Sequence, residues 1–208
     1  MELELLLSFI GVSILLILMP GPDNIFVLLE SLKNGSKTGI LISIGLVLGV
    51  LGHTLIAATG LTIVIQKSDF LFELIKFAGA GYLLYLAYLE LKEKITPIDT
   101  LNSEIGKENR TKLIRKGFFM NILNPKVSLF FIAFFPQFVS ETGFHVSIQM
   151  VILGLIFMSL AFSIFSTVAL LANQLTSYLQ SVLFLKITKV VKVVTFCVLA
   201  VVLILSSR

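Results

Sequence analysis

The feature that most constrains this chain is a series of long, nearly uninterrupted apolar runs. Six of them can be read along its 208 residues: 3–32, 38–65, 70–91, 117–138, 146–171 and 187–205. Most exceed the roughly 20 residues that a helix needs to cross a bilayer. They lack the short alternating segments of about ten residues that a transmembrane barrel would show. We therefore predict an all-α integral membrane protein with six transmembrane helices.

The composition agrees with a membrane protein. Apolar residues make up 57% of the chain and charged residues 13%, against about 45–50% and about 25% in ordinary soluble domains. The mean hydropathy is +1.02. The sixth run is short, and residues 174–186 before it resemble an amphipathic helix in the membrane interface. A five-span form with one segment in the interface therefore stays open beside the six-span form.

Basic residues are distributed unevenly between the segments that connect the runs. Most follow the first and third runs or flank the start of the sixth (Lys33, Lys37, Lys92, Lys94, Lys107, Arg110, Lys112, Arg115, Lys116, Lys186, Lys189 and Lys192), whereas Lys67 stands alone after the second. Lysine and arginine concentrate on the cytoplasmic side of membrane proteins, so we expect both termini outside. The chain then divides into a three-helix repeat at 1–91, a cytoplasmic basic linker at 92–116 and a second three-helix repeat at 117–208. The two repeats would enter the membrane from opposite sides.

The first run is interrupted at Pro20, Gly21 and Pro22. Each proline removes a backbone donor and clashes with the preceding turn, so a continuous helix is not expected. The second proline suits the first turn of a new half-helix, which places Asp23 and Asn24 at its positive end. Backbone groups freed in a membrane must be buried in protein or line a wet cavity. The break therefore predicts a polar cavity. A packing kink without a ligand is the alternative, although a kink needs no aspartate.

The fourth run contains a second interruption, Asn121-Ile-Leu-Asn-Pro-Lys126. Pro125 interrupts or kinks the helix. Lys126 places an ammonium group at membrane depth, which costs at least about 2.5–3.5 kcal/mol at the bilayer centre. We expect this lysine to face the protein interior and to find a partner there, for which Asp23 is the natural choice. Snorkelling of the lysine to the surface is the alternative.

Both interruptions lie about ten residues from a basic flank, which corresponds to roughly 15 Å of helix in a hydrocarbon core about 30 Å thick. Asp23 and Lys126 would thus meet near the midplane, reached from opposite chain directions. Paired broken helices in the two halves of a chain are typical of a transporter's binding site. A charged pair there suits a zwitterion. Lys126 and the amides after Pro125 would bind its carboxylate, and Asp23, with Asn24 or Asn121, would bind its ammonium group. Asp23 is also a candidate to accept a proton during the cycle.

Two motifs carry a family resemblance. The first is Met19-Pro-Gly-Pro-Asp-Asn24 with the glycines that follow it (Gly35, Gly39, Gly45, Gly49 and Gly60), and the second is Asn121-Ile-Leu-Asn-Pro-Lys126 with Phe130-Phe131 and Pro136-Gln-Phe138. Together with the length, the six runs and the basic linker, they resemble the lysine exporter (LysE) family of bacterial amino-acid exporters. The motif matches fall on Pro20, Gly21, Pro22, Asp23, Asn24, Asn121, Asn124, Pro125 and Lys126.

The resemblance implies a secondary transporter in the bacterial cytoplasmic membrane. Its cargo would be amino acids or closely related small metabolites, moved out of the cytoplasm by the proton gradient or the membrane potential. Asp23, Asn24, Asn121, Asn124 and Lys126 would bind the substrate. A coupling proton or another ion would take part, and both a monomer and a homodimer stay open.

His53 and Glu30 are further polar candidates within the runs. His53, in the second run, is a candidate to line the pathway or relay protons, because histidine titrates near neutral pH. A histidine hydrogen-bonded to a neighbouring helix is the alternative. Glu30 lies near the end of the first run, where it can pair with Lys33 or act in gating. Gly45 and Gly49 form a small-xxx-small pair, which predicts close packing of two helices.

Other functions are disfavoured by the residue types. Cys197 is the only cysteine, which excludes an internal disulfide and a cysteine-based metal site. With a single acid at mid-membrane, a metal-cation carrier is the weaker alternative. We expect no enzyme and no cofactor, because no zinc signature or Ser/His/Asp arrangement is present. The net charge of +4 does not indicate a nucleic-acid partner, because the charges lie in the connecting segments. A non-transporting scaffold is a further alternative, although it would not need polar residues on two broken helices.

Overall fold

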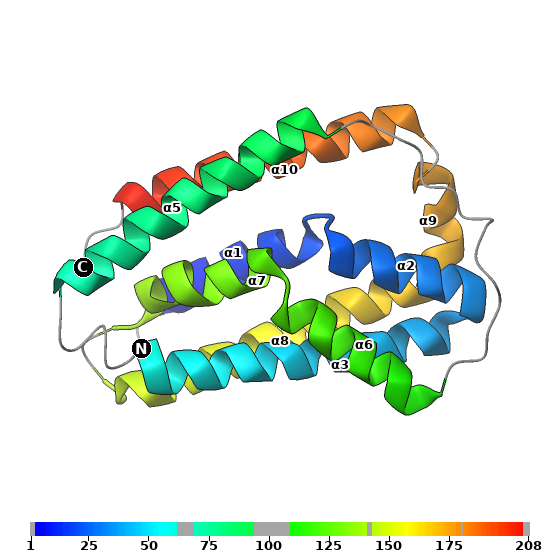
Figure 1. The fold of residues 1–208 in the computed structure, drawn as a ribbon. Helices are drawn as coiled ribbons and strands as arrows, with labels where there is room; N and C mark the ends of the chain where they lie inside the picture. The colour runs from blue at the N-terminus through cyan, green and yellow to red at the C-terminus, as the bar shows by residue number, and fades with distance from the viewer. Residues whose placement is uncertain (1–2, 62–68, 94–108, 141–142, 180, 206–208) are drawn as a thin grey trace.

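The computed structural model describes residues 3–61, 69–93, 109–140, 143–179 and 181–205, and every regular element within them is a helix (Figure 1). The elements are α1 Leu3–Leu18, α2 Pro22–Asn34, α3 Ser36–Ile56, η1 Ala57–Leu61, α5 Asp69–Lys92, α6 Arg110–Ile122, α7 Pro125–Leu129, η2 Phe130–Phe134, η3 Phe135–Phe138, α8 Val146–Leu170, α9 Ala172–Leu179 and α10 Val182–Leu205. The predicted all-α class is confirmed. Residues 94–108 of the predicted linker lie outside the described residues, and residues 110–116 form the first turns of α6.

Four of the described helices are long and apolar enough to cross a membrane by themselves: α3 continued into η1, α5, α8 and α10. Two further spans are bent pairs. α1 and α2 meet at 54°, and α6 meets the stretch Pro125–Phe138 at 51°. Counting each pair as one span gives the six spans predicted. Both bends fall at the predicted proline interruptions, because proline cannot continue the hydrogen-bond ladder of the preceding helix.

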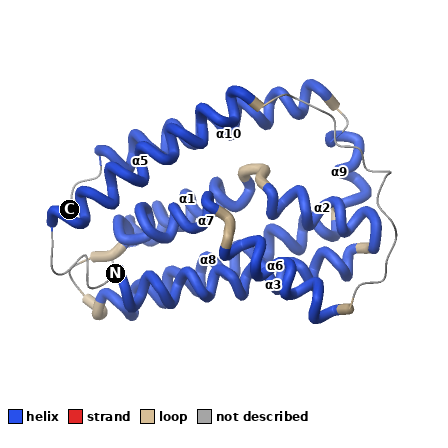
Figure 2. Tube along the Cα trace, in the orientation of Figure 1, coloured by secondary structure: helices blue, strands red, loops and turns tan. Residues whose placement is uncertain are grey.

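The spans pack into a bundle with one helix pair along its edge. α3 packs against α6 and α8, α1 and α2 both pack against α8, and α5 pairs with α10 along one edge (Figure 1). The loops inside the two bent spans lie halfway along the bundle, in its interior (Figure 2). Pairing α3 with α8 and α5 with α10 is what a twofold axis between two three-helix repeats would produce. We therefore keep the division into two repeats as a proposal.

The sixth span differs from the prediction. α10 begins at Val182, five residues earlier than expected, and the single amphipathic helix predicted for 174–186 is wrong because α9 ends at Leu179. The reason is a serine cap: Ser181 Oγ accepts a hydrogen bond from the Phe184 amide at 3.3 Å, which favours a helix start at this point. Three lysines consequently lie inside α10 rather than at its entrance: Lys186, Lys189 and Lys192.

Phenylalanine rings join α1 to the irregular end of the fourth span. Phe9 of α1 is fully buried and packs edge to face on two rings of η3, with centroid distances of 5.6 Å to Phe135 and 5.3 Å to Phe138. Its ring also lies 6.0 Å from Phe130 in η2. Aromatic pairs at these separations stabilise a core beyond the area that they bury. The cluster therefore fixes the two broken spans to each other on one side of their bends.

α3 and α6 approach so closely that backbone meets backbone. A Cβ added at Gly45 would overlap the carbonyl oxygen of Ile114, and Gly117 on α6 is equally confined. One turn further along α3, a Cβ at Gly49 would lie 2.7 Å from Cβ of Asn121. The predicted close packing at Gly45 and Gly49 is confirmed. The second of these glycines also leaves the room that Asn121 occupies.

Replacing Gly45 by alanine is expected to destabilise the protein by about 1–3 kcal/mol, because a Cβ in this contact forces the two backbones apart. Thermal unfolding in detergent micelles measures the change. Gly81→Ala on α5 is the matched control, because a Cβ there meets no atom within 4 Å. Equal stability of the two variants would contradict the backbone contact.

Candidate functional site

The break in the first span is closed by Asn24. The carbonyl groups at the end of α1 lack the partners that a continuing helix would give them. The side-chain amide of Asn24 donates to the carbonyl oxygens of Ile17 at 2.9 Å and Met19 at 3.1 Å. Gly21 between the two helices is extended, with φ −151° and ψ −176°. A residue in the first turn of α2 therefore caps the last turn of α1.

Lys126 reaches the same end of α1 from the second broken span. Its ammonium group donates to the carbonyl oxygens of Leu16 and Met19, both at 3.1 Å. A cation is stabilised at the carbonyl end of a helix, and in a membrane every freed carbonyl needs such an internal partner. The lysine is only partly exposed. It reaches into the bundle instead of snorkelling to the surface, and it joins the two breaks directly.

The second break has its own cap. Pro125 is the first residue of α7, and Asn124 precedes it with its Oδ1 accepting the Lys126 amide at 3.0 Å. Ser128 Oγ donates to the Asn124 carbonyl oxygen at 3.1 Å. The Nδ2 of Asn124 is buried and has no acceptor among the described residues. The start of α7 is thus fixed by local hydrogen bonds, which hold Lys126 in place.

Asp23 and Asn121 face each other inside the bundle. They are 2% and 1% exposed, and Asn121 Nδ2 lies 3.5 Å from Asp23 Oδ2, which is a long hydrogen bond. The other side-chain oxygen of each residue is buried without a donor in the described part of the chain. Buried polar atoms without partners are uncommon in folded proteins. Each of these two oxygens therefore keeps an unused acceptor position in the described part of the chain.

The predicted ion pair between Asp23 and Lys126 is wrong. Both residues are among those that the structure describes, and no ion pair joins their side chains. The ammonium group of Lys126 binds the carbonyl oxygens of Leu16 and Met19 instead. Breaking α1 exposes these carbonyls beside Lys126, and they compete with the carboxylate. The two side chains nevertheless line the same pocket.

A small pocket lies where these groups converge. It is lined by Leu16, Ile17, Asp23, Val50, Asn121, Lys126, Val127, Phe157 and Phe165. Its volume is about 10 Å³, which is about the room that a single water molecule needs. The wall holds one group of each charge and one amide, and the rest is apolar. Such a pocket offers complementary charges to a small zwitterion once its walls move apart.

His53 and Glu30 do not line this pocket. His53 is buried, its Nε2 lies 3.4 Å from the Asn121 carbonyl oxygen on α6, and its ring stacks on Phe131 at 5.5 Å. It therefore touches the site through the backbone of Asn121. Glu30 accepts a hydrogen bond from Asn34 at 3.0 Å. It lies about 10 Å along α2 from Asp23, by helix geometry.

The apolar wall from α8 was not predicted from the sequence. Phe157 and Phe165 both line the pocket and lie eight residues apart. That spacing puts them on one face of a helix, which is the only signal that pointed to them. The chain contains 18 phenylalanines, so the spacing does not distinguish these two from residues that pack or face lipid.

A multi-pass helical protein with a charged pocket between two broken spans has the architecture of a transporter. The sequence profile of the LysE type translocator family matches residues 14–207. The chain therefore belongs to this family, and the predicted resemblance is confirmed. It is a translocator, not an enzyme.

Several known proteins are similar to this chain. An uncharacterized membrane protein of Bacillus subtilis, YrhP, is 35% identical over 163 residues, which cover 75% of this chain and 77% of the relative. A leucine efflux protein of Klebsiella pneumoniae is 27% identical over 175 residues, with coverage of 84% and 82%. A leucine efflux protein of Salmonella choleraesuis is 29% identical over 167 residues, with coverage of 80% and 78%. No solved structure matches the chain.

Replacing Asn24 by alanine is expected to lower the free energy of unfolding by about 1–3 kcal/mol, because buried carbonyls of α1 lose their donor. Asn34→Ala, at the other end of the same helix, is the control. It removes only a bond to Glu30 one turn away and is expected to cost about 0.2–0.5 kcal/mol. Unfolding of both variants in detergent gives the comparison. An Asn24 variant as stable as the Asn34 variant would mean that Lys126 alone satisfies the end of α1.

Proposed function

We propose that this protein is a secondary transporter that exports amino acids from the cytoplasm across the bacterial cytoplasmic membrane. The observation that carries the proposal is the pair of opposite charges, Asp23 and Lys126, which two broken spans bring to one pocket with apolar walls. Two relatives named as leucine efflux proteins support an amino acid as the cargo.

The pocket chemistry suggests how a zwitterion would bind. Lys126 would exchange its bonds to the α1 carbonyls for bonds to the substrate carboxylate. Asp23 Oδ1 and Asn121 Oδ1, both without donors among the described residues, would accept the substrate ammonium group. Phe157 and Phe165 would pack against an apolar side chain. Asn24 would act through α1, because its amide nitrogen is already bonded there.

Transport requires the pocket to open, because its present volume is close to that of one water molecule. The bends of 54° and 51° lie beside it, so a small rotation of either half-helix would widen it. A substrate shifts a protein towards the conformation that it binds better. An amino acid that replaces the bond between Lys126 and α1 would therefore favour the open form.

Energy coupling follows from the same group of residues in this proposal. Asp23 is the acid of the pocket and would carry a proton in one half of the cycle, so that the proton gradient or the membrane potential drives export. His53, beside the Asn121 backbone, would deliver that proton. Both termini would lie outside the cytoplasm, and the protein would work as a monomer or a homodimer.

Neutralising either charge of the pocket is expected to slow export. In liposomes loaded with a panel of labelled amino acids that includes leucine, Asp23→Asn and Lys126→Gln should each reduce the initial efflux rate by roughly 10- to 100-fold. The reason is that a hydrogen bond to a charged group contributes about 1.5–3 kcal/mol, and about 1.4 kcal/mol corresponds to a factor of ten. Rates are measured with and without an imposed proton gradient.

Two exposed charges give the matched controls for this experiment. Glu4→Gln at the start of α1 and Lys37→Gln in the first turn of α3 make the same chemical changes far from the pocket, and we expect wild-type rates from both. If both pocket variants export amino acids at the wild-type rate, the protein is still a transporter, but Asp23 and Lys126 do not form its binding site. No efflux of any amino acid by folded wild-type protein would favour another cargo, such as a metal cation, or a scaffold.

A further inference from the structure

An ion pair links α5 to α10. Lys192 Nζ lies 2.9 Å from Glu90 Oε1, and the two side chains are only 17% and 14% exposed. Lys192 follows ten residues after Val182, so it lies about 15 Å along α10 from its first residue. That places it inside a helix which is long and apolar enough to span a membrane. Ionisable residues within membrane-spanning helices are costly and commonly mark the path of a substrate or ion.

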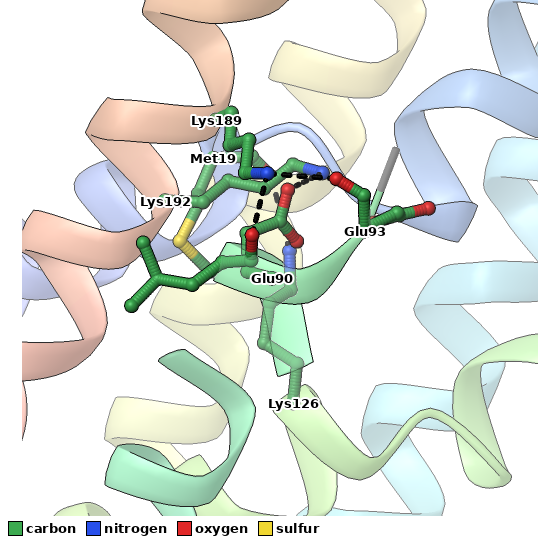
Figure 3. A network of polar contacts seen from close by, with 7 residues as sticks. Met19, Glu90, Glu93, Lys126, Lys189 and Lys192 are labelled. Atoms are coloured by element: carbon green, nitrogen blue, oxygen red, sulfur yellow. Dashed lines mark hydrogen bonds and ion pairs between the residues drawn. The ribbon is translucent and has the colours of Figure 1, made fainter. Parts of the chain in front are cut away.

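Other contacts besides this ion pair join α5 to α10. The two helices pack along each other, and Lys189 donates to the carbonyl oxygens of Leu91 at 2.8 Å and Glu93 at 2.7 Å (Figure 3). These bonds cap the end of α5 with a cation, which is favourable at the carbonyl end of a helix. The second lysine, one turn further on α10, is therefore not the sole connection between the two helices.

Lys126 belongs to the same group of charges. Its ammonium group donates to the Met19 carbonyl oxygen at 3.1 Å, and Figure 3 draws both residues beside the Glu90–Lys192 pair. Lys126 also lines the pocket with Asp23. Two ammonium groups that approach each other away from bulk water attract an anion strongly, because the local dielectric constant is low. The broken spans and the α5–α10 pair thus share one charged region.

We propose that Glu90 and Lys192 form a second, exchangeable part of the substrate site, which binds the zwitterionic head of an α-amino acid as it passes between the α5–α10 pair and the broken spans. Lys192 joins Lys126 in binding the substrate carboxylate. Glu90, released from Lys192, accepts the substrate ammonium group. When the substrate leaves, the ion pair forms again and closes the path. This inference rests on the proposed function and adds two binding residues to it.

A purely structural ion pair and a substrate-binding pair respond differently to reversal of their charges. A structural pair holds α5 to α10 in either orientation, so E90K/K192E would restore what each single change removes. A substrate-binding pair has a fixed polarity, because Lys126 stands beside Lys192 and an acid at position 192 would pair with Lys126 instead of the substrate. The apolar pair E90L/K192M leaves no lone charge, and such replacements often preserve or increase stability.

The experiment measures the concentration dependence of efflux from liposomes, with labelled leucine or whichever amino acid of the panel the wild type exports fastest. Glu90→Gln and Lys192→Gln are expected to raise KM at least about tenfold, with a smaller change in kcat. E90K/K192E and E90L/K192M are expected to melt near the wild-type temperature without regaining the wild-type KM. The control is Glu73→Gln, which breaks another ion pair of α5, to Lys76 at 2.8 Å, and is expected to keep KM within twofold.

The outcomes separate this proposal from the proposed function. If either folded double variant shows the wild-type KM, or if the single variants match Glu73→Gln, the Glu90–Lys192 pair is structural and the inference fails while the exporter stands. If the wild type itself exports no amino acid, the proposed function fails, and this inference fails with it. If the single variants unfold, the folded double variants decide: a KM raised at least about tenfold supports the inference, and the wild-type KM overturns it.

Discussion

The structure depends on how the carbonyl groups at the broken end of α1 are satisfied. A membrane offers no water to these groups, so the protein has to supply donors. Asn24 supplies one from the next helix, and Lys126 supplies another from the opposite half of the chain. The second donor is the more consequential, because it ties the two broken spans together at the level of the pocket. Asp23, in the first turn of α2, lines the pocket beside that contact.

This arrangement keeps the charges of the site close without neutralising them. Asp23 retains one carboxylate oxygen without a donor in the described part of the chain, while the ammonium group of Lys126 is held by backbone carbonyls. Carbonyl dipoles are weaker partners than a carboxylate. A substrate carboxylate can therefore displace them, whereas a direct ion pair between Asp23 and Lys126 would compete with the substrate at both ends. The bonds with which Lys126 caps α1 are therefore also what leaves Asp23 free to bind a substrate.

Much of this organisation was predictable from the sequence. Proline has a steric effect that does not depend on context, so the two breaks and the half-helix start at Pro22 followed from residue type and spacing. Side-chain partners did not follow, because they depend on tertiary geometry. Lys126 was expected to bind the only nearby acid, yet the carbonyls freed by the break lie within its reach. The partner of Glu90 lies 102 residues further along the chain, and no local pattern connects the two. The start of α10 was missed because a single serine cap outweighed the apolar periodicity.

The contact between Gly45 and Gly117 limits which substitutions can accumulate in this sequence during evolution. Where two side chains meet, one can change and the other can compensate. Here the atoms that a new side chain would strike belong to the main chain of the facing helix, and no substitution can remove main-chain atoms. Neither glycine can therefore be replaced by another residue without destabilising the contact between the helices. Descendants of this protein can keep the two glycines or rebuild the whole interface between α3 and α6, with no gradual route between these states.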